Sequence, residues 1–197
     1  MEDFEATPGD SERIEQMAAH IRALIELMGD DPTREGLVKT PVRAAKALLY
    51  ATRGYRQNGG EVMRQAIFEY AGSQMVVVKD IEFYSMCEHH ILPFFGRVSI
   101  GYLPDGKMIG LSKLARLVDV YAHRLQVQER LTAQVCEDVM KSLHACGAIV
   151  LCNGEHLCMK MRGVEKQHSS TTTVHYAGAF ADELRLREEF YQALKAM

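Results

Sequence analysis

The chain has 197 residues and a formal net charge of −3, and 47% of its residues are hydrophobic and 25% are charged. These proportions are typical of globular proteins and exclude the disordered and fibrous classes. The length allows one substantial core, or one domain with a helical extension, and we expect the second arrangement. The small net charge gives no reason to expect nucleic acid or an anionic membrane as a partner.

The sequence also predicts where the protein resides. No apolar run approaches the ~20 residues that cross a bilayer, and the acidic N-terminus lacks the basic and apolar segments of an export signal. We therefore expect a cytoplasmic protein. Its five cysteines are an odd number, which favours free thiols and metal ligands over a disulfide framework.

The first part of the chain predicts helices after a short polar tail. An apolar stripe at helical spacing begins at Ile14, and Gly29 is expected to end this helix. Thr40-Pro41 combines a cap residue with Pro at the first helical position and predicts a second helix, which Gly54 stops. A short helix is expected over residues 61–68.

The character of the sequence then changes, so we expect an N-terminal tail and helical region over 1–72 and a second domain over 73–197. Runs rich in Val, Ile, Phe and Tyr predict strands. The expected strands are 74–86, 94–103, 148–162 and 170–178. Three helices are also expected. The first begins after Gly110-Leu-Ser112, the second runs from about Gln128 to Ala145, and the third runs from Leu184 to Ala196. This order predicts an α+β fold, an antiparallel four-stranded sheet with two helices on one face.

A thiol, a carboxylate and two imidazoles occupy consecutive positions between the first two predicted strands, from Cys87 to His90. A Cys-x-x-His pair can bend round one Zn²⁺ and leave the intervening His89 free as an acid or base. Downstream, Cys158 offers a second thiolate and His156 another proton-transfer group. Cys87, His90 and Cys158 would form a Cys₂His site with an open fourth position, as in catalytic zinc sites.

Further residues are predicted to surround this site. On an alternating strand His156, Cys158, Lys160 and Arg162 would share one face. Cys136, Cys146 and Cys152 have no His at ligand spacing and are expected to be small buried hydrophobes.

A second cluster, Ser112, Lys113 and Arg116, stands at the start of a predicted helix. If Ser112 caps the helix, free N–H groups and two cations would form a phosphate grip. Such a cap followed by basic residues is also common with no ligand, so both interpretations stay open. Arg43 and Lys46 share a helical face, for which a solvated basic edge is the simpler interpretation.

Glu129 near a helix start has two interpretations. It can compensate the helix dipole, or its carboxylate can accept paired N–H bonds from a guanine edge.

With these residues assembled, the chain resembles the zinc-dependent GTP cyclohydrolase I family over roughly residues 12–195. Five motifs in the right order are far more specific than one Cys-x-x-His pair. The motifs are Met86-Cys-Glu-His-His90, Ile109-Gly-Leu-Ser-Lys-Leu-Ala-Arg116, Arg124-Leu-Gln-Val-Gln-Glu-Arg-Leu-Thr132, His156-Leu-Cys-Met-Lys-Met-Arg-Gly163 and Thr171-Thr-Thr173, and Thr40-Pro-Val-Arg43 extends the resemblance.

The resemblance implies a role for each candidate residue. The implied zinc ligands are Cys87, His90 and Cys158. The residues implied to move protons are His89 and His156. The implied guanine readers are Glu129 and Gln128. The implied triphosphate ligands are Ser112, Lys113, Arg116 and Arg162, with Arg43 and Lys46 reaching in from a neighbouring subunit.

The resemblance also implies the reaction and the assembly. Zinc-activated water would hydrolyse the purine ring of GTP at C8 and release formate. Ribose rearrangement would then give 7,8-dihydroneopterin triphosphate for folate or another pterin pathway. The implied fold is the tunnelling fold, in a toroidal homodecamer of two pentamers with active sites at subunit boundaries. Two thiolates favour zinc over Fe²⁺ or Mn²⁺.

Two alternatives stay open. One is a relative that acts on another purine nucleotide. The other is a catalytically silent oligomer that zinc staples together and that binds nucleotides. His89 and His156 argue against the second, because a structural zinc site needs no proton-transfer groups. Residues 165–170 and 174–178 depart from the family pattern. The contacts at the edge of the substrate and the identity of any regulatory partner therefore stay open.

Overall fold

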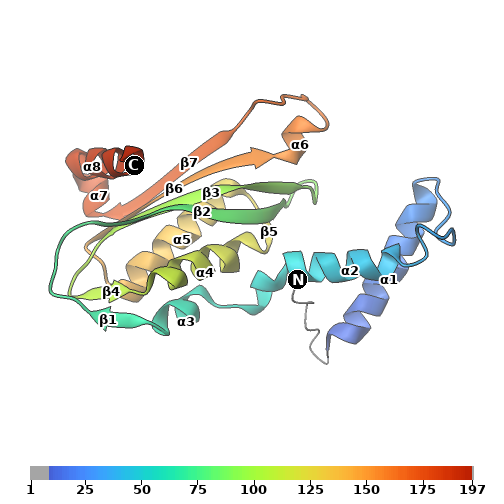
Figure 1. Cartoon of the computed structure of the whole chain (residues 1–197), viewed down its shortest axis with the longest axis horizontal. Helices are drawn as coiled ribbons and strands as arrows, with labels where there is room; N and C mark the ends of the chain where they lie inside the picture. The colour runs from blue at the N-terminus through green and yellow to red at the C-terminus, as the bar shows by residue number, and fades with distance from the viewer. Residues whose placement is uncertain (1–8, 197) are drawn as a thin grey trace. The chain divides into compact units, whose positions relative to one another are not determined.

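The computed structural model describes residues 9–196, and its contacts divide the chain into two units that meet between Thr52 and Arg53. Figure 1 shows the order of the elements along the chain. The domain boundary expected between residues 72 and 73 stays a prediction. Every helix in the described range is too short or too polar to cross a bilayer.

The first unit is a pair of helices, α1 (Asp10–Leu27) and α2 (Thr40–Ala51). Their contact is apolar and is formed by Ile14, Ala18, Ala45 and Leu49. Gly29 follows α1 with φ +91°, and its N–H and that of Asp30 donate to the carbonyls of Glu26 and Ile25. This is a Schellman motif, in which glycine adopts the left-handed conformation without strain.

The start of α2 differs from the prediction. Lys39 occupies the cap position in a helical conformation, and Thr40 is already the first helical residue. The reason is that the preceding turn is wound, since the Thr40 N–H donates to the carbonyl of Leu37. The hydroxyl of Thr40 is therefore not the cap.

The second unit begins with short elements, the 3₁₀ helix η1 (Arg53–Arg56), α3 (Gly59–Arg64) and β1 (Ile67–Glu69). The helix expected over 61–68 begins earlier, because the Asn58 side chain accepts the Glu61 N–H and caps it. β1 pairs antiparallel with β4 (Lys107–Ile109).

The main sheet has the strand order β5-β2-β3-β6-β7. Its long strands are antiparallel neighbours, as predicted: β2 (Val76–Cys87), β3 (Pro93–Leu103), β6 (Gly147–His156) and β7 (Thr171–Gly178). The short β5 (Leu125–Gln126) adds a two-residue parallel pairing to the end of β2. The α+β prediction is confirmed, and β5 is an addition that a two-residue pattern could not reveal.

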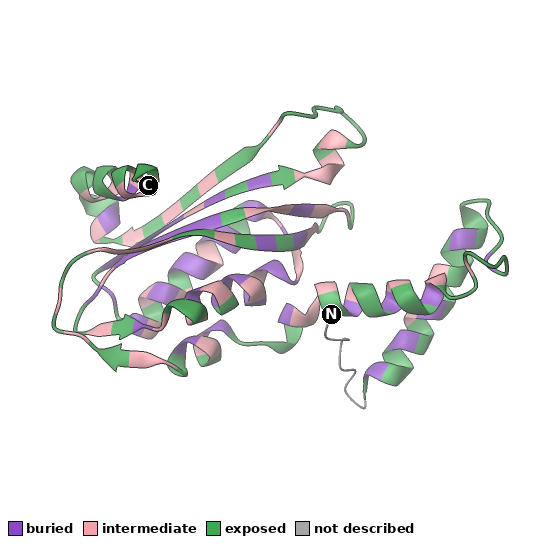
Figure 2. Cartoon of the chain, viewed as in Figure 1, coloured by how far each residue is buried: buried purple, intermediate pink, exposed green. Residues whose placement is uncertain are grey.

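Helices cover both faces of this sheet. α4 (Leu111–Ala122) and α5 (Gln128–Leu143) pack on one face, as predicted. Along β6, Ala148, Val150 and Cys152 join the core under these helices, while Ile149 packs with Phe190 of α8 (Leu184–Lys195) on the opposite face. The short α7 (Ala179–Asp182) leads into α8. Figure 2 shows this alternation of burial along the strands.

A β-bulge in β2 determines which face Cys87 occupies. The pairing with β3 shifts between Val78 and Ile81, where Asp80 has φ +57°. Before the bulge the even-numbered Val78 faces the α4–α5 core, and after it the odd-numbered Phe83 and Cys87 do. Because side chains alternate along a strand, Cys87 would point to the other face without this extra residue.

The third long strand is shorter than predicted. β6 ends at His156, and Leu157–Lys160 form the short helix α6. The expectation that positions 156 to 162 alternate on one strand face is therefore wrong. His156 pairs with Phe94, and the preceding residue of β3 is Pro93, which has no N–H to extend the ladder.

Candidate functional site

The connection between β2 and β3 is a tight turn that begins at Cys87. The N–H groups of His90 and Ile91 donate to the Cys87 carbonyl, and the Cys87 N–H donates to the Leu92 carbonyl. Ile91 has φ +54°, a left-handed conformation that β-branched residues rarely adopt. Such backbone strain concentrates at functional sites, and here it lies next to His90.

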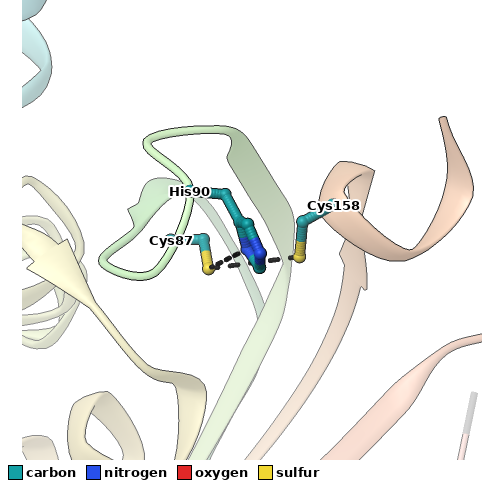
Figure 3. A group of neighbouring side chains, drawn as sticks. All are labelled: Cys87, His90 and Cys158. Carbon is teal, nitrogen blue, oxygen red and sulfur yellow. Dashed lines mark hydrogen bonds between the residues drawn. The ribbon is translucent and has the colours of Figure 1, made fainter. Parts of the chain in front are cut away.

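Cys87, His90 and Cys158 converge on one point (Figure 3). The Sγ atom of Cys87 lies 3.8 Å from Nδ1 of His90 and 4.0 Å from Sγ of Cys158. A tetrahedral zinc ion with ligand bonds of ~2.0–2.3 Å holds neighbouring ligand atoms ~3.5–3.8 Å apart. The donor set and its spacing therefore fit a metal ion such as zinc.

Residues distant in sequence meet here because of strand register. β3 lies between β2 and β6, and its first residues pair with Met86 on one side and His156 on the other. Cys87 and Cys158 therefore leave the same end of the sheet. Cys87 is buried, Cys158 is half-buried and His90 is exposed, which leaves one side of the cluster open to solvent.

The surroundings of Cys158 shift the pKa of its thiol. Burial and the neighbouring Cys87 raise the pKa of the Cys158 thiol, and the positive charge of Arg162 opposes that shift. Arg162 is exposed and lies just after α6, near enough to Cys158 for its charge to act on that thiol. A bound cation would favour the thiolates that metal ligation requires.

Glu88 and His89 occupy the exposed side of the turn. Nδ1 of His89 lies 3.9 Å from the Cys87 sulfur. The Glu88 carboxylate forms an ion pair with Arg130 of α5, and this hydrogen bond lowers the pKa of Glu88. Arg130 also donates through Nε to Oε1 of Gln126, 2.8 Å away. Sequence reasoning did not find this ion pair, because its partners are 42 positions apart.

His156 ends β6 beside the cluster. Its ring stacks on Phe94 with a centroid separation of 4.6 Å and an interplanar angle of 4°. Its Nε2 lies 2.9 Å from Oε1 of Gln128, the first residue of α5. Burial lowers the pKa of His156, and the negative charge of Glu129 opposes that shift. Glu129 is exposed, whereas Gln128 is buried.

The phosphate-grip candidates lie elsewhere. α4 begins after β4, at the end of β3 that is remote from Cys87 (Figure 1). β3 has 11 residues, which at ~3.3 Å per residue separate its ends by ~30 Å. A single chain therefore does not bring Ser112, Lys113 and Arg116 to the cysteine–histidine cluster.

The local structure of this second cluster corrects one expectation. Gly110, not Ser112, occupies the cap position of α4, because Gly110 is extended and its carbonyl accepts the Lys113 N–H. Ser112 and Arg116 are exposed, and the Lys113 ammonium donates to Oε1 of Gln65 at 2.7 Å.

Arg43 and Lys46 are exposed on α2, in the first unit of the chain. Their predicted role depends on a neighbouring subunit and stays a prediction.

The other cysteines differ in burial. Cys136 and Cys152 are buried as predicted, and burial raises the pKa of each thiol to about 12. Cys146 is exposed, so the expectation of a buried hydrophobe is wrong there. It lies between α5 and β6, where its backbone N–H donates to Leu103 and its carbonyl accepts from Ala179. Backbone pairing holds this position in place and leaves the side chain outside the core.

Comparison with solved structures gives a remote likeness. An archaeosine synthase of the QueF-like type, in its apo form, is 20% identical with a TM-score of 0.45, over 56% of this chain and 98% of that chain.

Comparison with known sequences is far more specific. The family model described as GTP cyclohydrolase I matches residues 17–195. GTP cyclohydrolase 1 of Bacteroides fragilis is 50% identical over 94% of this chain and 95% of its own length. The Porphyromonas gingivalis protein of the same name is 52% identical over 91% and 92%, and that of Deinococcus radiodurans is 53% identical over 88% and 81%. Since these matches extend over nearly the whole described structure, the chain belongs to the GTP cyclohydrolase I family.

Proposed function

We propose that this chain catalyses the hydrolysis of the GTP purine ring at C8, with release of formate and formation of 7,8-dihydroneopterin triphosphate. The observation that carries the proposal is the convergence of Cys87, His90 and Cys158 beside His156, in a chain of this family. A purely structural metal site would not need an imidazole held next to it.

The metal proposed for this cluster is Zn²⁺. Cys87, His90 and Cys158 would hold it, and a set with two thiolates favours zinc over harder cations. Bound zinc would supply the activation of water for hydrolysis at neutral pH. The exposed side of the cluster, where His90 and His89 lie, is where the nucleotide would approach.

The neighbouring side chains would transfer protons and bind the guanine and the triphosphate. His156 would hold a proton close to the purine, and the exposed His89 would move one at the ribose. Glu129 stands exposed at the start of α5, where its carboxylate can accept two N–H bonds from a guanine edge. Arg162 lies close enough to Cys158 to affect its pKa, and we assign it to the triphosphate.

The distant basic cluster argues for an active site shared between subunits. Ser112, Lys113 and Arg116 lie at the opposite end of the sheet from the cluster of Cys87. We propose that they grip the triphosphate of a nucleotide bound at a neighbouring subunit, together with Arg43 and Lys46. In the described part of the chain, β7 has one paired edge and β2 is paired on its β5 side only at Met86 and Cys87.

These open edges support a homodecamer of two pentameric rings. An unpaired strand edge promotes aggregation unless another strand or element covers it. Pairing of β2 with β7 of the next subunit would close a ring and cover both edges.

The experiment is incubation of the purified, zinc-loaded protein with GTP. We expect release of formate and a product that becomes fluorescent on oxidation, with zinc content measured on the same sample. ATP and ITP serve as comparison substrates, with products identified by mass spectrometry. A zinc-replete protein that releases no formate from GTP would refute the proposal, and faster turnover of another nucleotide would reassign the substrate.

A further inference from the structure

The side-chain amide of Gln128 is fully engaged within the protein. Gln128 is 1% exposed. Its Nε2 lies 3.0 Å from the carbonyl of Cys152, 2.9 Å from that of Thr171 and 3.2 Å from Oγ1 of Thr173. Its Oε1 lies 2.9 Å from Nε2 of His156. Every polar atom of this side chain therefore has a partner in the protein itself.

The direction of each hydrogen bond follows from the chemistry of the partners. A carbonyl oxygen can only accept, so the amide nitrogen must face Cys152 and Thr171. The Thr132 hydroxyl donates its single proton to the Gln128 backbone carbonyl at 2.7 Å. In the 2.6 Å pair of Thr132 and Thr173, Thr173 must then be the donor, and its oxygen can share one of the two Gln128 amide hydrogens with a carbonyl.

This network allows only one orientation of the amide. A flipped amide would place Oε1 against two carbonyl oxygens and leave buried acceptors without donors, which costs about 1–3 kcal/mol for each unsatisfied group. Oε1 therefore faces His156. Because Oε1 can only accept, Nε2 of His156 carries a hydrogen, and in the neutral ring Nδ1 carries the lone pair.

Two neighbours fix the positions of these groups. Phe94 stacks on the imidazole and sets the plane of the ring. Gly154 leaves the space that the amide fills, since a Cβ at this position would lie 2.5 Å from Oε1 of Gln128. The Thr171–Thr173 run, a sequence motif without an assigned role, supplies two partners of the amide, and Thr132 bonds Thr173 and the Gln128 backbone carbonyl.

We infer that Gln128 is a positioning residue, which holds His156 in the Nε2–H tautomer and presents Nδ1 as its free ring atom. Recognition of guanine at this helix start then falls to the exposed Glu129 alone. The identity of the ligand that meets Nδ1 rests on the proposed function, whereas the tautomer rests only on the contacts within the chain.

Neutron diffraction from deuterium-exchanged crystals of the wild-type protein, grown near pH 8, tests the tautomer directly. We expect deuterium on Nε2 of His156 and none on Nδ1, with the Gln128 ND₂ group facing Cys152 and Thr171. Deuterium on Nδ1 beside a bare Nε2, or a reversed amide, would overturn the inference. This measurement needs no turnover, so it remains decisive even if the wild-type protein releases no formate from GTP.

Kinetics of Gln128→Met test the consequence. Methionine keeps the length of the side chain and removes both of its hydrogen-bonding groups. Loss of a residue that orients a site ligand or base reduces activity about 10- to 100-fold, so we expect kcat to fall at least ~10-fold with KM for GTP changed by less than ~2-fold. A raised KM with unchanged kcat would instead identify Gln128 as a direct substrate contact and overturn the inference.

A matched pair of threonine variants provides a second test if Gln128→Met fails to fold. Thr173→Val removes the hydroxyl that accepts from Gln128, while Thr172→Val alters the exposed neighbour on the same strand. Because the two carbonyls still hold the amide, we expect kcat to fall less for Thr173→Val than for Gln128→Met, with wild-type kinetics for Thr172→Val. A fall in kcat for Thr172→Val as large as that for Thr173→Val would contradict the inference.

Discussion

At the scale of single residues, the cysteines separate into proposed metal ligands and residues outside the cluster. Cys158 lies 4.0 Å from Cys87, sulfur to sulfur, whereas Cys146 is exposed between two elements. We expect Cys158→Ser to lose zinc and formate release while it keeps its assembled size, because Cys158 is half-buried at the edge of the fold. Zinc content and size-exclusion chromatography check this outcome.

Cys146→Ser is the matched control for this prediction. It should keep zinc and activity. If Cys158→Ser instead fails to fold, zinc at this position has a structural role, as in domains that fold only with their metal.

His123 predicts how stability depends on pH. It is buried at the end of α4, and its Nδ1 lies 2.9 Å from the Asp119 carbonyl. Burial lowers its pKa below the unfolded value of 6.5. The unfolded chain then binds more protons in the interval between the two pKa values, so stability is complete above pH ~6.5 and falls as pH drops through that interval.

Urea denaturation of metal-free protein at pH 7.5 and 5.5 measures this effect. His123→Asn keeps a donor near the Asp119 carbonyl and removes the titration, so it should lose less stability than the wild type on acidification. His156, whose pKa is also lowered by burial, leaves a residual dependence of the same sign. An unchanged pH dependence would exclude His123 as a source.

At the scale of elements, the turn between β2 and β3 places a strained residue next to His90, a proposed metal ligand. Ile91 is left-handed with φ +54°, and 55% of its surface is exposed. Asparagine adopts this conformation more readily than isoleucine. Ile91→Asn should therefore raise the free energy of unfolding by about 1 kcal/mol, measured by urea denaturation, while zinc affinity is retained. A lower stability would show that the Ile91 side chain is packed in the assembled protein.

The bulge in β2 and the end of β6 determine where Cys87 and Cys158 lie. The bulge turns Cys87 toward the α4–α5 core, and Pro93 ends the ladder where Cys158 must leave the strand. Each is a local departure from a regular strand. Together they bring two thiols to one end of the sheet, which regular strands with the predicted parity would not achieve.

At the scale of the whole molecule, two groups of predicted substrate residues lie at opposite ends of one sheet. Cys158→Ser disables the metal end, and Arg116→Ala disables the distant basic end. Each variant alone should be inactive. Coexpressed in equal amounts, they should recover about one quarter of the wild-type activity, because a quarter of the boundaries between subunits would combine two intact halves.

A second mixture controls for this experiment. Cys158→Ser and His156→Ala both alter the same end, so their mixed oligomers should stay inactive. Recovery in this control, or none in the first mixture, would contradict an active site shared between subunits.

The sequence alone determined the elements and the chemistry of this protein. Helical periodicity located the helices, and runs rich in Val, Ile, Phe and Tyr located the four long strands, because burial and packing on a pleated surface select these residues locally. Cys87-x-x-His90 was recognisable as a pair of candidate ligands, and His156-x-Cys158 as a further candidate pair, from residue type and local spacing. These features depend on neighbours within a few positions, and a sequence displays them directly.

The tertiary structure decided how these pieces face one another. The bulge at Asp80, the end of β6 at Pro93 and the burial of Gln128 under Thr171 and Thr173 depend on pairing between distant segments. The sequence could not show that Cys146 is exposed or that Ser112 lies a strand length from Cys87. Strand register and amide direction are fixed by hydrogen bonds across the sheet, and no local pattern encodes those partners.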